Sequence, residues 1–264
     1  IFWEDIPYAV APVGDLRWKA PRELVSPESF IELKEGNGCL QEASIYAGIQ
    51  GEGIVGQEDC LYLDIQAPVN NSNRRLPVMF WIHGGGNTSG VKDYYDFSEF
   101  IKKQQVIVVT INYRLGPMGW FTHPAIQGPQ NRLDKTSNFG TLDIIQALKW
   151  VQNNITEFGG DSDNVTIFGE SAGGHNVLSL LSSPISNGLF HKAISQSGYT
   201  TTFTLGEAFG SDANGDTVNE LGSDLALSQN DLSGYGSIKK LYMEDPIKYG
   251  EEFQRYLRSV DGKG

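Results

Sequence analysis

The sequence predicts an α/β fold in which a mainly parallel central sheet carries helices on both faces. Two apolar runs, residues 77–82 and 106–113, have the length of strands and little polar alternation, as in strands buried on both faces. Residues 141–158 place apolar side chains at three- and four-residue spacing, which predicts an amphipathic helix. Strands that alternate with helices are typical of a parallel sheet.

The other elements follow from similar patterns. Residues 1–21, rich in proline and aromatic residues, are expected to be irregular or short-stranded. Apolar residues at alternate positions predict a strand over 61–66, and together with the early region it supplies antiparallel strands. The glycine-bearing segment between Cys39 and Cys60 lacks strong periodicity and is interpreted as a surface loop. The remaining expected elements are helices over 96–103 and 175–181 and strands over 165–168 and 192–195.

Composition limits the possible functions. The 264 residues show neither a linker nor an internal repeat, so residues 1–264 are predicted to form a single domain. A formal net charge of −12 disfavours nucleic acid and anionic membranes as partners. No apolar run approaches a membrane span, and no metal-binding or phosphate-binding spacing occurs. We therefore expect no metal and no cofactor; the oligomeric state is left open.

The stretch Gly-Glu-Ser-Ala-Gly at residues 169–173 is the strongest candidate for chemistry. An apolar run precedes it and a helix-compatible run follows it. In this context G-x-S-x-G is the signature of a sharp strand-to-helix turn that exposes a serine at its tip with strained backbone angles. The helix N-terminus beneath favours negative charge. Taken alone, the pentapeptide is also common by chance and fits an ordinary turn before a helix.

A second motif, Gly84-Gly85-Gly86, directly follows a predicted buried strand. Three consecutive glycines are costly in conformational entropy, so they usually serve a close approach of the backbone to something else. A flexible loop is one reading. The functional reading is an oxyanion hole made of backbone N–H groups.

Together with further stretches, these motifs resemble the type-B carboxylesterase/cholinesterase family of α/β-hydrolases over nearly the whole chain. The other matching stretches are residues 6–9, 12–17, 58–63, 81–83, 112–114, 158–161, 165–168 and 196–198. The resemblance implies an α/β-hydrolase fold with Ser171 as nucleophile. It also implies oxyanion N–H groups on Gly85, Gly86 and Ala172.

The resemblance assigns supporting roles to several other residues. Glu170 and Ser197 match a buried acidic and hydroxyl pair beside the catalytic machinery. Arg17 with Glu58, and Arg114 with Asp143, match structural salt bridges.

Counting alone leaves Cys39 and Cys60 as either a disulfide or two buried thiols. The resemblance implies that they form the family's first disulfide. A disulfide in turn favours an extracytoplasmic location, secreted or periplasmic, although no signal peptide is visible.

The function implied is a serine hydrolase that cleaves small-molecule carboxylic esters through an acyl-enzyme. Two alternatives stay open: a non-catalytic adhesion module on the same fold, and an amidase or lactonase using the same site. The Cys39–Cys60 segment lacks the tryptophan with which cholinesterases hold quaternary ammonium, so choline esters are not expected. Asp64 replaces the family's usual asparagine, and no consequence for chemistry is expected.

The catalytic base is not expected among the four histidines. In this family the acid and the histidine follow the serine at a distance, whereas His83 belongs to the glycine loop and His123 precedes the serine. His175 lies on the helix that leads away from the serine, and His191 precedes a strand. We therefore expect a missing C-terminal part to supply both groups, a sheet incomplete at both ends, and a fragment that is inactive and exposes apolar surface.

Overall fold

The computed structural model describes residues 1–25, 37–69, 75–121 and 132–200. Its main feature is a six-stranded sheet in the order β1-β4-β6-β5-β7-β8. The strands are β1 (Phe2–Pro7), β4 (Tyr62–Gln66), β5 (Leu76–Ile82), β6 (Ile107–Ile111), β7 (Gly160–Glu170) and β8 (Lys192–Gln196). Strands β6, β5, β7 and β8 run parallel, whereas β1 and β4 pair antiparallel. The predicted fold class and the early antiparallel strands are therefore confirmed.

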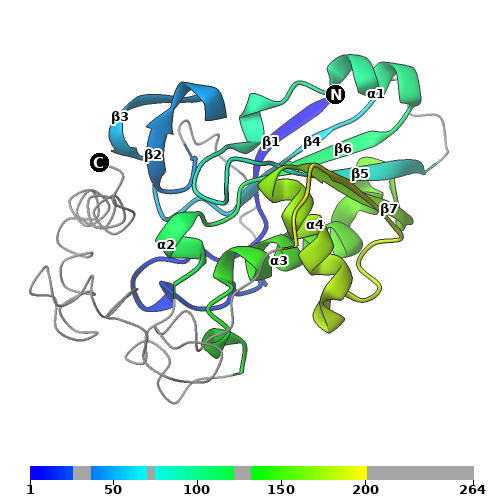
Figure 1. Cartoon of the computed structure of the whole chain (residues 1–264). Coiled ribbons are helices and arrows are strands. Elements are labelled where there is room, and N and C mark those ends of the chain that lie inside the picture. The colour runs from blue at the N-terminus through cyan, green and yellow to red at the C-terminus, as the bar shows by residue number, and fades with distance from the viewer. Residues whose placement is uncertain (26–36, 70–74, 122–131, 201–264) are drawn as a thin grey trace, which may run out of the picture.

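The strand order places the helices on both faces. The chain moves from β5 to β6 in one direction and then returns across β5 to β7 and β8. Right-handed crossovers therefore put α1 (Ser98–Gln104) on one face and α3 (Phe139–Asn154) and α4 (Ala172–Ser182) on the other. Figure 1 shows this arrangement, with α1 across the sheet from α3 and α4. The strand order reverses at β5, so the carboxyl ends of β5 and its neighbours form the edge where ligands bind in open α/β sheets.

The core lies between β5, β6 and α3. All residues of β6 are buried, as the continuous apolar run predicts. Helix α3 buries Ile144, Leu148 and Val151 against the sheet. The predicted helix 141–158 is correct except that its last turn, Ile155–Phe158, is a 3-10 helix. Gly159 ends that turn with a φ of 83°, a conformation that suits glycine.

The expectation of a surface loop between Cys39 and Cys60 is wrong. This segment contains the antiparallel strands β2 (Gln41–Ser44) and β3 (Ile49–Val55), which form a sheet of their own. Gly48, with a φ of 76°, makes the turn that precedes β3. Most of β3 is exposed, so its residues carry no apolar alternation that would reveal a strand.

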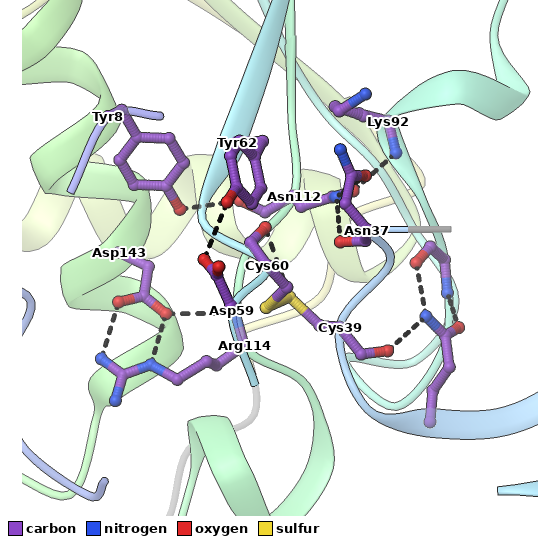
Figure 2. Close-up of a disulfide and its surroundings, with 12 residues drawn as sticks. Tyr8, Asn37, Cys39, Asp59, Cys60, Tyr62, Lys92, Asn112, Arg114 and Asp143 are labelled. Carbon is purple, nitrogen blue, oxygen red and sulfur yellow. Dashed lines mark hydrogen bonds and ion pairs between the residues drawn. A yellow bond between two sulfur atoms is a disulfide. The ribbon is translucent and has the colours of Figure 1, made fainter. Parts of the chain in front are cut away.

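Covalent and ionic links tie distant segments together. A disulfide joins Cys39 to Cys60, and Arg17 contacts both carboxylate oxygens of Glu58. The buried Arg114 guanidinium donates to both oxygens of Asp143, at 2.8 Å from Nε and 2.7 Å from Nη2. Figure 2 shows the disulfide with the Arg114–Asp143 pair on one side. Among the described residues, no helix is long and apolar enough to cross a bilayer.

The Arg114–Asp143 pair gives a test of the fold. In the intact protein, Asp143→Ala should lower the free energy of unfolding by roughly 3–5 kcal/mol, because it leaves the Arg114 charge buried without a partner. Urea unfolding measures the effect. The exposed Glu99–Lys102 pair provides the control, and Glu99→Ala should change stability by no more than about 0.5 kcal/mol. Equal effects of the two substitutions would contradict the importance given to the buried pair.

Candidate active site

Ser171 occupies a strained turn between β7 and α4. Its φ of 55° and ψ of −118° lie in a region that side-chain-bearing residues rarely adopt. The turn is held at both sides: the Ser171 N–H donates to the Gln196 carbonyl at 2.9 Å, and the His175 N–H donates to the Ser171 carbonyl at 2.9 Å. The serine therefore sits at the carboxyl edge of the sheet, directly before the N-terminus of α4.

The glycines on either side of Ser171 allow the turn to press against β5. A Cβ on Gly173 would lie 2.0 Å from the carbonyl oxygen of Ile82, the last residue of β5. A Cβ on Gly169 would lie 2.7 Å from that oxygen and 2.6 Å from the Gly173 carbonyl carbon. No side chain fits at these distances. The close backbone contact explains why the motif has glycine at both positions.

The glycine loop that follows β5 lies beside the serine. A Cβ on Gly84 would be 3.3 Å from the Ser171 Cβ and 2.8 Å from the Glu170 carbonyl oxygen. Gly85 and Gly86 follow with φ values of 94° and 64°.

The N–H groups assigned to oxyanion binding remain available for a ligand. The N–H groups of Gly85, Gly86 and Ala172 donate to no other group within the described part of the chain. The Ala172 N–H belongs to the first turn of α4, where N–H groups lack partners within the helix. The arrangement can therefore offer backbone donors to a negative charge that forms next to Ser171.

Glu170 and Ser197 lie near the serine, but the structure contradicts their expected burial. A Cβ on Gly84 would lie 3.2 Å from Glu170 Oε2, so this carboxylate borders the glycine loop. Both Glu170 and Ser197 are exposed. Glu170 is the last residue of β7, and Ser197 directly follows β8, the edge strand of the described sheet.

The described histidines bond to backbone groups and not to Ser171. The buried ring of His83 stacks on Tyr113, and burial lowers the pKa of His83 to about 4, so the ring is neutral. His175 Nδ1 lies 2.5 Å from the Tyr199 carbonyl oxygen. His191 Nδ1 accepts the Val165 N–H at 3.1 Å. His123 falls outside the described residues.

A buried charge cluster, which sequence reasoning missed, lies next to the glycine loop. Lys92 Nζ is 2.8 Å from Asp5 Oδ1 and 2.9 Å from Asp64 Oδ1, and it also contacts Asp93. Lys92 and Asp64 are only 2% and 1% exposed. Asp64 thus has a structural consequence that was not expected. In the sequence, both residues look like ordinary surface charges, and only the pairing of β1 with β4 brings their partners together.

The cluster shifts the proton equilibria of its members. Burial raises the pKa of Asp64 to about 7, although the Lys92 ammonium opposes this shift. Burial alone would lower the pKa of Lys92, but the Asp64 and Asp93 carboxylates outweigh burial and raise it. Three carboxylates therefore share one ammonium, and one carboxyl keeps its proton to a higher pH than usual.

Comparison with known proteins identifies relatives over most of the chain. Residues 1–234 match the model of the family described as "Carboxylesterase family". The fumonisin B1 esterase of Sphingopyxis macrogoltabida is 43% identical over 229 residues, which are 84% of this chain and 40% of that protein. The para-nitrobenzyl esterase of Bacillus subtilis (strain 168) is 43% identical over 209 residues, 78% of this chain and 42% of the relative.

Solved structures agree with the sequence comparison. The structure of a thermophilic PNB esterase superimposes with a TM-score of 0.78 and 35% sequence identity. The alignment covers 100% of this chain and 51% of the esterase chain. The carboxylesterase EST55 of Geobacillus stearothermophilus aligns with 73% of this chain and 38% of its own, with a TM-score of 0.61 and 38% identity. The fold is thus that of an α/β-hydrolase. The chain spans about two fifths of the length of these two curated relatives.

The charge cluster predicts a dependence of stability on pH. The pKa of Asp64 is raised in the folded state, so its protonated form favours folding. This contribution to stability is fully present below about pH 4, the ordinary range of an aspartate in the unfolded chain, and is lost as the pH rises through about 7. Relative to Asp64→Asn, the wild-type protein should therefore lose stability between pH 5 and pH 8, on the order of 1–2 kcal/mol. Melting temperatures of both proteins at the two pH values measure this.

The exposed Asp163 supplies the matched control, since Asp163→Asn should keep the wild-type pH dependence. A stability difference between wild type and Asp64→Asn that stays constant from pH 5 to pH 8 would contradict the raised pKa.

Proposed function

The chain belongs to the carboxylesterase family, and on this premise we propose that the intact protein hydrolyses carboxylic esters through an acyl-enzyme on Ser171. The observation that carries the proposal is the position of the glycine loop: a Cβ on Gly84 would lie 3.3 Å from the Ser171 Cβ. A nucleophile and a row of backbone donors therefore meet at one edge of the sheet. This is the combination that acyl transfer requires.

The proposed reaction has two stages. Ser171 Oγ attacks the ester carbonyl carbon while a base takes its proton, and the carbonyl oxygen becomes an oxyanion. The N–H groups of Gly85, Gly86 and Ala172 stabilise that oxyanion, each donor contributing about 3 kcal/mol to the transition state. The alcohol leaves with a proton, and water then attacks the acyl-enzyme and releases the acid. Every step uses side chains, backbone groups and water.

We assign the base and its acid to a part of the protein C-terminal to these residues. Supporting this, each described histidine ring already contacts a backbone group of another segment or its own loop. The resemblance stated above also places both partners far beyond the serine. Completion of the site would then depend on the segment that brings the histidine to Ser171.

The proposed substrates are small, mostly apolar esters, and the proposed location is extracytoplasmic. The names of two relatives point to esters of different size, fumonisin B1 and para-nitrobenzyl esters. The location rests on the Cys39–Cys60 disulfide, because disulfides persist mainly in oxidising compartments.

The first test is removal of the nucleophile. In the intact protein, Ser171→Ala should reduce turnover of short-chain p-nitrophenyl esters by at least about 10³-fold and abolish labelling by an organophosphonate. Ser182→Ala, on the exposed end of α4, is the control and should leave both unchanged. Labelling that survives in Ser171→Ala would refute the assignment. A wild-type protein that neither turns over esters nor is labelled would favour the adhesion module.

The second test concerns substrate choice. Turnover of acetylcholine should be at least about tenfold less efficient than that of an uncharged ester of equal length, because the Cys39–Cys60 segment offers Tyr46 and no tryptophan for cation–π contact. Comparing kcat/KM for the two esters measures this, and p-nitroanilides of the same acids separate an esterase from an amidase. Efficient acetylcholine turnover with competitive inhibition by tetramethylammonium would show the prediction to be wrong.

A further inference from the structure

The oxyanion loop, defined here as residues 84–90, is folded back on itself. The Ser89 N–H donates to the Gly85 carbonyl at 3.0 Å. A Cβ on Gly90 would lie 2.2 Å from His83 Nδ1 and 3.0 Å from the Gly84 carbonyl oxygen. The end of the loop is thus packed directly against its beginning. A displacement of Gly90 would therefore act on Gly84, which borders Ser171.

Gln41 holds Gly90 by both of its backbone polar groups. The Gly90 N–H donates to Gln41 Oε1 at 2.7 Å, and Gln41 Nε2 donates to the Gly90 carbonyl at 3.0 Å. Two bonds to one residue fix its orientation as well as its position. Gln41 is 4% exposed, so water does not compete for these bonds. Gln41 belongs to β2, outside the sheet that carries Ser171.

The disulfide fixes the other side of Gln41. Gln41 Nε2 also donates to the Cys39 carbonyl at 2.9 Å, and Cys39 is bonded to Cys60, two residues before β4. The Gln57 N–H donates to the Gly38 carbonyl at 2.9 Å and closes the base of the hairpin. A continuous set of contacts therefore runs from β4 through the disulfide and Gln41 to Gly90.

We propose that Gln41 is a positioning residue for the oxyanion loop and that the Cys39–Cys60 disulfide holds Gln41 in place. This inference rests on the proposed function, because Gln41 is proposed to hold in place the loop whose N–H groups stabilise the oxyanion. Such donors act only when they lie about 2.7–3.1 Å from the developing charge. A shift of about 1 Å in a catalytic site can cost on the order of 10²-fold in rate. Gln41 itself touches neither the substrate nor Ser171.

The experiment compares Gln41→Ala with a matched glutamine in the intact protein. Gln152 also donates twice from Nε2, to the Ser162 and Leu189 carbonyls at 3.0 Å each, but both acceptors lie in segments away from the oxyanion loop. We expect Gln41→Ala to lower kcat for a p-nitrophenyl ester by about 10- to 100-fold with KM within about twofold. Gln152→Ala should keep both constants within about twofold.

A second readout separates positioning from loss of stability. A trifluoromethyl ketone forms an oxyanion on the serine, so its affinity should weaken by the same factor as kcat/KM in Gln41→Ala. If the alanine variant does not fold, Gln41→Glu replaces it, since it keeps the acceptor for the Gly90 N–H and removes both donors. A Cys39→Ser/Cys60→Ser protein should also show a lowered kcat. In both this protein and the Gln41 variant, the loss should persist at saturating substrate concentration.

The outcomes distinguish this inference from the proposed function. Ester turnover that depends on Ser171 but is unchanged in Gln41→Ala or Gln41→Glu overturns the role of Gln41 and leaves the proposed function intact. An equal loss in Gln152→Ala also overturns it, because the effect would then be one of general stability. Turnover that persists in Ser171→Ala refutes the proposed function itself.

Discussion

The site depends on one close approach of two backbones, at the carboxyl ends of β5 and β7. The Gly173 Cα lies so near the Ile82 carbonyl that a methyl group there would be 2.0 Å from the oxygen. This contact fixes where the turn at Ser171 sits relative to the loop that continues from β5. The unusual φ and ψ of Ser171 are a consequence, because the chain must leave β7 and enter α4 within a single residue.

Around this contact, polar groups anchor the oxyanion loop along its length. The Tyr113 hydroxyl donates to the His83 carbonyl at 2.7 Å at its start, and Asn176 of α4 donates to Asn87 at 2.8 Å in its middle. Just beyond its end, the Asn112 side chain accepts the Lys92 N–H at 2.8 Å, a contact seen beside the disulfide in Figure 2. A loop rich in glycine is therefore not mobile by composition alone, since its neighbours decide where its backbone lies.

How much the sequence reveals depends on whether a feature is encoded locally. The strands β5 and β6, helix α3 and the turn at Ser171 each have their pattern within one stretch, and the structure contains all of them. The hairpin of the Cys39–Cys60 segment has no such pattern, because most of β3 faces solvent.

Features that depend on distant partners, and that neither a local pattern nor the family resemblance indicates, could not be predicted. The burial of Lys92 and Asp64 depends on partners up to 87 residues away, from Asp5 to Lys92. The same is true of Gln41, whose neighbour Gly90 is 49 residues distant. The exposure of Glu170 and Ser197 could not be read from the sequence either, because it depends on which segments pack over the ends of β7 and β8.

The strand order also determines in which sequence the strands can pair while the chain is being synthesised. Strand β5 is synthesised before both of its neighbours in the sheet, β6 and β7. About 25 residues separate the end of β5 from the start of β6, and about 80 separate it from β7, so the apolar residues of β5 stay unpaired while these are made. The contact between Gly173 and the Ile82 carbonyl, which places Ser171, can form only after β7 and the start of α4 have been synthesised. The disulfide partners and β4, in contrast, are complete before β5 begins. Gln41 and the disulfide that supports it are therefore synthesised before Ser171, so the oxyanion loop can take up its position before the nucleophile exists.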